Sequence, residues 1–403
     1  MIRKNKTVKF NFIELLIIIV LAYIIAPVVS RFISTVLTTY FYMLIVVVLV
    51  FLVFFVKGNK SANDCFFLLL PFLCWKGFAF LLPKDNLIIW AYGALLDILP
   101  LLLGYYFVNH VGKSEKLEFF VRFLFAAFLI TGITTILGCI QYPDAARYMA
   151  TVENSSEARA VLYTWNNIGG YSFVYMLVLL HPVLILAYKK QRIKKVTAIF
   201  CSVAIVSVTI FSAYATALLL ALLSCFFYFF KKNLSIQALW IWIIFGVVLV
   251  IFSDSLFSKA LLWLADVVNN DIIAYRLEAL AGGKVGIEGS EDNRIALYEA
   301  SLNTFFKNPI LGSCLSGGGG IGGHSFILDF MAQFGIIGAV VLFLMYRIIY
   351  IKFFLPYKNR EGYGFILWMF IQAILLSLIN TGMFLPVLAI FIPVFLKFVY
   401  KES

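Results

Sequence analysis

Long apolar stretches separated by short polar or charged segments run through the whole chain. A helix needs about 17–25 predominantly apolar residues to cross a bilayer. Twelve apolar stretches lie at residues 11–29, 39–56, 65–82, 87–108, 119–140, 168–188, 196–211, 214–230, 237–253, 325–346, 364–380 and 384–397. The weakest break between them is at residues 212–214. The pattern predicts an all-α, polytopic membrane protein with about twelve transmembrane helices.

Composition supports this prediction. The chain has 403 residues, of which 63% are hydrophobic and only 13% charged, so residues 1–403 are expected to form one transmembrane domain without a soluble module. The six cysteines contain no CxxC pair, which argues against a disulfide framework or a zinc site. The basic start before residues 11–29 resembles a signal peptide, but the length of the apolar stretch predicts an uncleaved first helix.

The distribution of positive charge predicts the orientation. A net charge of +12 would suit a nucleic-acid-binding protein, but basic cytoplasmic loops explain it better in a membrane protein. With both termini in the cytoplasm, 22 of the 32 lysines and arginines fall in or beside the inner segments 1–10, 57–64, 109–118, 189–195, 231–236, 347–363 and 398–403. Merging the seventh and eighth stretches would place Lys231 and Lys232 outside, so twelve spans are preferred.

Two outer segments are long, residues 141–167 and residues 255–323. Within the second, residues 256–268 are apolar enough to lie in the membrane interface. Residues 294–306 are predicted to form a helix, with Asp292 or Asn293 as its N-cap. The large outer loop is therefore expected to be structured.

The large loop ends in a glycine-rich run, residues 317–323, followed by His324. His110 and His181 fall near inner ends of spans, so His324 is the one histidine predicted outside. Its side chain suits proton transfer near neutral pH, although an isolated histidine can simply mark a helix boundary. The glycines lack the lysine and hydroxyl residue of a P-loop. They could form a flexible linker or bring backbone N–H groups close to an anion.

Outer arginines are candidate phosphate ligands, because guanidinium groups bind phosphate through two hydrogen bonds and stay charged. The candidates are Arg159, just before the sixth span, and Arg276 and Arg294 in the large loop. Each could instead be an interfacial anchor or a solvated charge. That second interpretation is preferred for three other outer cations, Arg31, Lys84 and Lys259.

Two ionisable residues fall inside predicted spans, Lys76 in the third and Asp97 in the fourth. Charges within a bilayer are costly and often functional. A short outer turn joins these spans, so the two residues could form a structural ion pair or line a polar cavity.

Three motifs resemble the O-antigen polymerase and O-antigen ligase superfamily. The first is the stretch 293–300 followed by 306–312, which ends in Asn-Pro-x-x-Gly. The second is His324-Ser325, nine residues, then Gly-x-x-Gly at 335–338. The third, at residues 159–170, has an arginine before an Asn/Gly-rich helix entry. The twelve spans and the two long outer loops also match the family, and order and sidedness make the combination fairly specific.

One departure bears on the subfamily. Ligases of this group commonly carry an arginine in the turn between spans seven and eight, whereas residues 211–216 contain none. This difference favours polymerase over ligase. The run from Gly322 to Asp329 also resembles a capsule-type polymerase.

The resemblance implies transfer of a glycan from undecaprenyl diphosphate onto the non-reducing end of another lipid-linked repeat unit, in the outer leaflet of the bacterial cytoplasmic membrane. His324 would act as general base, and Arg159 and Arg294 would stabilise the departing diphosphate with inversion at the sugar carbon. Further substrate-binding candidates are Arg276, Asn167, Tyr298, Ser325, Gly323, Lys76 and Asp97.

No cofactor and no metal is expected, because the first outer loop lacks the acids of metal-dependent polyprenyl-phosphate-sugar transferases. The expected partners are the lipid-linked oligosaccharide, the bilayer and a chain-length regulator, and no nucleic acid. A ligase with a different acceptor stays open as an alternative. A lipid-linked oligosaccharide flippase fits less well, since it needs charges along a central path. A purely structural membrane scaffold is the remaining alternative.

Overall fold

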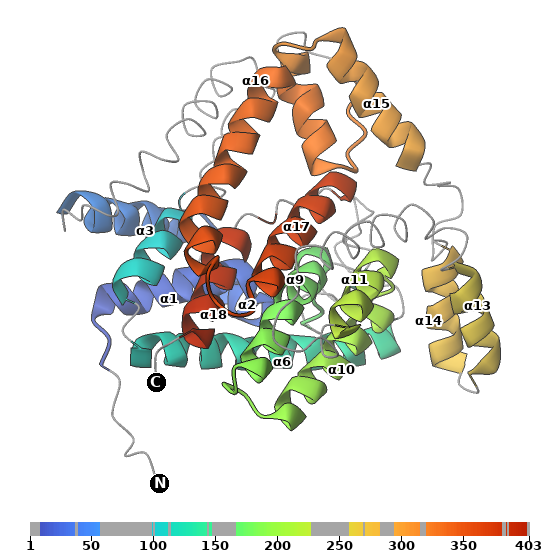
Figure 1. Cartoon of the computed structure of the whole chain (residues 1–403), viewed down its shortest axis with the longest axis horizontal. Helices are drawn as coiled ribbons and strands as arrows, with labels where there is room; N and C mark the ends of the chain where they lie inside the picture. The colour runs from blue at the N-terminus through green and yellow to red at the C-terminus, as the bar shows by residue number, and fades with distance from the viewer. Residues whose placement is uncertain are drawn as a thin grey trace.

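The computed structural model describes residues 9–36, 39–56, 99, 101–111, 114–142, 145–146, 167–226, 258–268, 271–282, 294–314, 320–380, 384 and 387–400. All regular elements in these ranges are helices (Figure 1). The α-helices are α1 (Phe12–Ile25), α2 (Pro27–Val36), α3 (Thr39–Phe51), α6 (Ser114–Gln141), α9 (Tyr171–Lys189), α10 (Lys195–Phe211), α11 (Ala215–Phe226), α13 (Ser258–Val267), α14 (Asp271–Gly282), α15 (Arg294–Lys307), α16 (Phe326–Ile349), α17 (Tyr363–Ile379) and α18 (Ile392–Val399). Short π- or 3₁₀-helical turns are Leu52–Val56, Phe107–Val111, Gly312–Cys314, Tyr350–Phe354, Leu355–Tyr357 and Val387–Phe391.

Three of the described helices are long and apolar enough to cross a bilayer: Glu115–Gln141, Tyr171–Lys189 and Phe326–Tyr357. The bent pair α1–α2 would add a fourth if it counts as one span. Large apolar side chains stay exposed on these helices, such as Leu137 at 60% and Phe343 at 65%. Such apolar surface suits contact with lipid rather than with water.

Helix α9 lies at the centre of the described core. Almost all of its residues between Phe173 and Ala187 are buried, whichever side of the helix they occupy. A helix that is apolar all round is expected in such a position. Helices α10, α11, α17 and α18 pack around it, and Phe128 of α6 contacts Phe173 of α9.

The first predicted span, residues 11–29, is divided by a bend in the structure. Helix α1 starts at a capping box formed by Asn11 and Glu14 and ends at Ile25. Ala26 is extended, and α2 then begins at Pro27 after a bend of 109°. Proline lacks the N–H that a helix needs and disfavours helical backbone at the preceding residue. The chain therefore turns sharply where a straight span was expected.

The predicted break between the seventh and eighth stretches is confirmed as a helix break. Helix α10 ends at Phe211, and α11 begins at Ala215. Ala213 between them has a positive φ of 55°, a conformation that no regular helix contains. The two helices pack against each other.

The stretch 325–346 was predicted as one span, but the structure breaks α16 at Gly335, which has φ 65° and ψ −160°. Figure 1 shows the two limbs of α16 meeting at a sharp bend. The amides of Ile336 and Ile337, which lose their helical partners there, donate to the carbonyls of Pro309 at 2.8 Å and Ile310 at 3.4 Å. The first limb is thus a short helix of its own.

Glycines make this contact sterically feasible. A Cβ on Gly335 would lie 2.3 Å from the Ile310 oxygen, and one on Gly312 would lie 2.4 Å from the backbone of Gln333. Gly312 also has a positive φ of 71°. The two glycines of the family-like motifs therefore lock the segment after α15 onto the bend of α16.

Polar contacts join connecting segments that share a predicted side of the membrane. On the predicted inner side, Lys190 pairs with Glu361 at 2.7 Å. Arg192 Nε there donates to the Val399 carbonyl at 3.0 Å. On the predicted outer side, the Tyr214 hydroxyl donates to the carbonyl of Ala146 at 2.7 Å and the Tyr298 hydroxyl to that of Ile379 at 2.9 Å; a further pair is Arg31 with Asn167.

Candidate functional site

Helix α15 forms the platform on which the end of the glycine-rich loop lies. The predicted helix over residues 294–306 is confirmed as Arg294–Lys307. The hydroxyl of Thr304 donates to the Gly320 carbonyl at 2.8 Å, and the Gly322 amide donates to Ser301 Oγ at 2.9 Å. The loop therefore runs antiparallel to α15, from the C-terminal half of the helix towards its N-terminus.

Gly322 brings the loop into direct contact with the helix backbone. A Cβ at this position would lie 2.0 Å from the carbonyl oxygen of Leu297 and 2.9 Å from its Cα. Only glycine fits such a close approach. Leu297 is three residues from Arg294, the first residue of α15, so the loop reaches this end of the helix as it approaches His324.

The backbone on both sides of His324 is held by one carboxylate. Asp329 Oδ1 accepts from the Gly323 amide at 3.3 Å, and Oδ2 accepts from the Ser325 amide at 3.1 Å. The Ser301 hydroxyl donates to Oδ1 at 2.5 Å and so links the carboxylate to α15. His324, half-buried between these two amides, thus lies on a built turn rather than in a flexible linker.

The C-terminal end of α17 fixes the other side of this turn. The Phe326 amide donates to the Asn380 carbonyl at 2.9 Å. Ser325 is fully buried, and its Oγ caps the first limb of α16 by accepting from the Leu328 amide at 3.1 Å. The predicted substrate-binding residues Ser325 and Tyr298 therefore both have structural hydrogen bonds.

His324 and Arg294 come from segments that approach each other. The path between them consists of two residues of extended chain, the Gly322–Leu297 contact and one helical turn. Together these lengths place the Cα atoms of His324 and Arg294 within about 17 Å of each other. A guanidinium, an imidazole and a diphosphate between them can span this separation. The side chain of Arg294 lies outside the described part of the structure.

Most described amides at the end of the glycine-rich run and the start of α16 already donate within the protein. They are the amides of Gly322, Gly323, Ser325, Phe326 and Leu328. For Gly323 and Ser325 the acceptor is the Asp329 carboxylate, which occupies the position that an anion would take. These five amides are therefore engaged, and the hypothesis that the backbone here binds an anion stays a prediction for the remaining ones.

Asn167 belongs to a second constellation at the entry of α9. Its φ of 48° is positive, and Arg31 Nη1 donates to its side-chain oxygen at 2.7 Å. Arg31 Nη2 donates to the carbonyl of Ile168 as well. The Thr134 hydroxyl donates to the backbone carbonyl of Asn167 at 2.8 Å. Arg31 was expected to be an anchor or a solvated charge. In the structure it holds this turn and donates to the side chain of Asn167, which was predicted to bind substrate.

Arg276 is carried by α14, which packs against α13 and α10 (Figure 1). Leu277 and Leu280 of α14 share a small core with Ala213 and Leu218 at the α10–α11 turn. The helix that bears Arg276 therefore lies beside the turn between α10 and α11. The Arg276 side chain itself is outside the described set, as are three other predicted residues, Arg159, Lys76 and Asp97.

Sequence reasoning did not assign hydrogen-bonding roles to Asp329 or Ser301, and it interpreted Arg31 as an anchor or a solvated charge. The available signal for Asp329 is an acid in the first turn of a helix, a position that often stabilises the helix start. No local pattern marks Ser301, because its partners are 21 and 28 residues away along the chain.

The comparisons with known proteins do not place the chain: no protein-family model, no curated protein and no solved structure matches it.

Proposed function

We propose that the chain is a membrane polysaccharide polymerase, which transfers a glycan from undecaprenyl diphosphate onto the non-reducing end of another lipid-linked repeat unit. One observation carries the proposal. The glycine-rich loop is hydrogen-bonded along α15 and delivers His324 towards the end of that helix where Arg294 begins. The backbones of a residue that can accept a proton and of a residue that carries a permanent cation thereby approach each other, and glycosyl transfer from a diphosphate needs both groups near the reacting atoms.

The proposed chemistry is a single displacement. The acceptor hydroxyl oxygen attacks the anomeric carbon, and the bond from that carbon to the diphosphate oxygen breaks. The hydroxyl proton passes to the His324 imidazole, and the electron pair leaves with undecaprenyl diphosphate. Arg294 and Arg159 stabilise the charge that grows on the leaving group, and Arg276 assists. Attack opposite the leaving group inverts the anomeric configuration.

The proposed placement is a twelve-span protein in the bacterial cytoplasmic membrane, with both termini inside and the loops 141–167 and 255–323 outside. The contacts between connecting segments support this arrangement. Lys190 with Glu361 and Arg192 with Val399 join segments predicted inside, whereas Tyr298 contacts the end of α17 on the side predicted outside. None of these contacts would form if the paired segments lay on opposite sides.

A ligase that uses another acceptor is the second candidate. The absence of an arginine from residues 211–216 favoured a polymerase. However, Leu277 and Leu280 dock α14 on this turn, so Arg276 lies on a helix next to it. A cation from the large loop can then take the place of the missing one. Polymerase and ligase share the chemistry above and differ in the acceptor.

Replacement of the proposed base and clamp tests the catalytic assignment. His324→Ala and Arg294→Ala should each abolish polymer growth in cells while expression and export of single repeat units continue. Lys307→Ala is the matched control, because Lys307 is an exposed cation at the opposite end of α15. Polymer of wild-type length in the His324→Ala strain would remove the proposed base.

The products that accumulate distinguish the two acceptors. Loss of a polymerase leaves single repeat units on lipid or on their final acceptor, whereas loss of a ligase leaves long lipid-linked chains. Transfer should also continue in the presence of a metal chelator. A strict requirement for a divalent metal would contradict the proposed clamp, in which arginines alone neutralise the diphosphate.

A further inference from the structure

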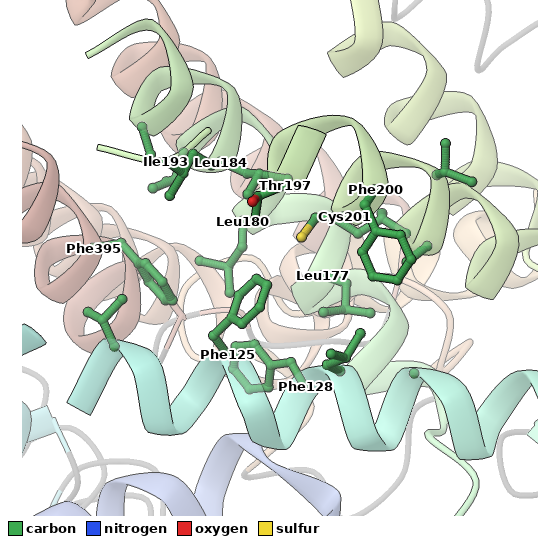
Figure 2. A pocket seen from close by; sticks show the side chains of 18 of the residues that line it. Phe125, Phe128, Leu177, Leu180, Leu184, Ile193, Thr197, Phe200, Cys201 and Phe395 are labelled. Atoms are coloured by element: carbon green, nitrogen blue, oxygen red, sulfur yellow. The ribbon is translucent and has the colours of Figure 1, made fainter. Parts of the chain in front are cut away.

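An apolar groove of about 570 Å³ lies between α6, α9, α10 and α18, and His324 is not among its lining residues (Figure 2). Figure 2 shows Phe125 of α6 directed towards Leu180 of α9, with Cys201 and Phe200 of α10 on the opposite side of the groove from α6. Pockets of 300–1,000 Å³ are the usual size of small-molecule sites. The volume and the lining suit a flexible hydrocarbon chain.

The groove opens sideways onto the apolar surface of the helices. Several lining side chains remain exposed, among them Ile133 at 48%, Phe200 at 56% and Val203 at 58%. These residues lie on helices apolar enough to be surrounded by lipid. A lipid can therefore enter from the bilayer without passing through water.

The groove is long enough for a chain that crosses most of a bilayer. On α6 its lining extends from Glu118 to Ile136, which corresponds to about 27 Å of helix, close to the roughly 30 Å of a hydrocarbon core. A Cβ on Gly132 of α6 would lie 3.5 Å from Val208 of α10, so the two helices meet near the far end. Figure 2 shows Ile193, in the turn before α10, on the side of the groove where Phe125 precedes Phe128 along α6, so both helices start at the other end.

The ionisable residues of the groove all lie at that starting end. Glu118 and Arg122 are in the first turns of α6, and Arg192 is in the turn between α9 and α10. Arg122 pairs with Glu118 at 2.5 Å but remains 77% exposed. Arg192 donates from its Nε to the Val399 carbonyl at 3.0 Å. Further in, Thr197 and Ser207 are the polar side chains.

The charge at this end is positive. Two guanidinium groups face one carboxylate, and the exposed Lys194 and Lys195 follow Arg192 directly. Arginine is well suited to phosphate, and basic pockets between membrane helices on the cytoplasmic side bind anionic lipid headgroups. We propose that the groove binds one anionic phospholipid, with an acyl chain along α6 and α10 and its phosphate at Arg122 and Arg192.

The position of the charges argues against the lipid carrier of the transfer reaction as the occupant. Arg192 lies in a segment predicted to be cytoplasmic, whereas His324 ends the loop predicted to be external. A carrier bound for transfer has its diphosphate on the side of His324. The proposal depends on membrane insertion and on this sidedness, and it does not depend on the catalytic roles of His324 or Arg294.

Lipid retention by the purified full chain tests the proposal. The protein is exchanged into detergent with equal amounts of phosphatidylglycerol and phosphatidylcholine of the same acyl composition, and bound lipid is counted by native mass spectrometry. The wild type should retain phosphatidylglycerol preferentially. Arg122→Gln and Arg192→Gln should each lower its retention about fivefold, since a basic residue at a membrane surface contributes roughly that factor. Lys358→Gln, an exposed cation outside the groove, is the control.

A second pair of variants tests the groove itself. Ala204→Phe places a ring in the groove and should lower retention of both lipids, whereas Ile199→Phe, on an exposed part of α10 outside the lining, should not. Ala204 is partly exposed and Arg122 is largely exposed, so substitutions at these two positions are compatible with folding.

Three outcomes would overturn the proposal. They are equal retention of the two phospholipids by the wild type, unchanged retention in the variants, and displacement of phosphatidylglycerol by an equal amount of undecaprenyl phosphate. The measurement uses no glycan substrate, so a failure here leaves the proposed transfer reaction untouched.

Discussion

Replacement of Asp329 by alanine should release the turn that carries His324. Its carboxylate accepts hydrogen bonds from Ser301 Oγ at 2.5 Å, from the Ser325 amide at 3.1 Å and from the Gly323 amide at 3.3 Å. Hydrogen bonds to a charged group contribute about 1.5–3 kcal/mol each. We take the two shorter bonds at the low end of this range and assign no contribution to the long, exposed one. The turn then loses about 3 kcal/mol of stability. Local opening of the turn should then be about 150-fold more frequent.

Hydrogen exchange measured by mass spectrometry on the full chain in lipid nanodiscs reports this opening. Peptides covering residues 320–328 should exchange faster in Asp329→Ala by about the factor above, while peptides from α9 keep their protection. Glu299→Gln is the matched control, because Glu299 is an exposed acid on α15. Exchange of the 320–328 peptides within about threefold of the wild type would refute the role assigned to the Asp329 carboxylate.

The same variant separates the structure of the turn from its proposed chemistry. A displacement of about 1 Å at a catalytic group can cost about 100-fold in rate, so Asp329→Ala should lower kcat by about that factor and change KM less. Asp329→Asn keeps one acceptor oxygen but turns an N–H towards the Ser325 amide, and should fall between alanine and wild type. Faster exchange with an unchanged transfer rate would retain the described turn and reject His324 as the base.

Three further substitutions test other parts of the fold. Gly335→Ala places a Cβ at a position with a positive φ, 2.3 Å from the Ile310 oxygen. It should lower the free energy of unfolding, measured by denaturation in detergent, by about 3 kcal/mol. An unchanged midpoint would contradict the described bend. Arg31→Lys loses the forked donor at the entry of α9 and should cost about 2 kcal/mol in the same assay, while full stability would show that the clamp contributes nothing. The pair Lys190–Glu361, 24% and 37% exposed, should show a coupling energy below about 1 kcal/mol in a double-mutant cycle, and a coupling above about 2 kcal/mol would place it in a much drier environment.

Helix positions could be predicted from the hydropathy pattern, because apolar periodicity and breakers act locally. The stretch predicted at 196–211 is the helix Lys195–Phe211, and 364–380 is Tyr363–Ile379. The helix predicted at 294–306 in the polar loop also agrees, since Lys307, Asn308 and Pro309 mark its end. Spans at 65–82 and 237–253 lie outside the described residues.

The bends were harder to predict, because tertiary contacts decide them. Pro27 is a local signal for a helix break, but the prediction gave more weight to the length of the apolar stretch. Gly335 is not a breaker by itself, since glycine occurs inside many membrane helices. Its helix breaks because the carbonyls of Pro309 and Ile310, about 25 residues earlier, accept from the freed amides. No pattern within residues 325–346 contains this information.

In the candidate site, too, some features follow from the sequence and others depend on tertiary contacts. His324 could be selected because it is the one histidine on the predicted outer side, a property of topology and composition. The hydrogen bonds that hold the His324 turn could not be predicted, because Ser301 contacts this turn only when the loop lies back along α15. Asn167 shows the same limit: Arg31, far away along the chain, donates to its side chain and Thr134 donates to its backbone carbonyl, contacts that no local pattern reveals, while its role in substrate binding stays a prediction.

The hydrogen bonds around His324 constrain how a diphosphate could be held there. A helix start commonly binds anions through its free amides, but at the start of α16 the amides of Gly323 and Ser325 donate to Asp329, and that of Phe326 donates to Asn380. The carboxylate of Asp329 also adds a negative charge beside the site. An anion next to His324 therefore needs cationic side chains that more than offset this charge. Arg294, at the end of α15 towards which the loop runs, is the candidate that the described backbone brings towards His324. It follows that Arg294→Lys, which keeps the charge but loses the forked donor, should weaken transfer far less than Arg294→Ala if charge dominates, and nearly as much if bidentate geometry does.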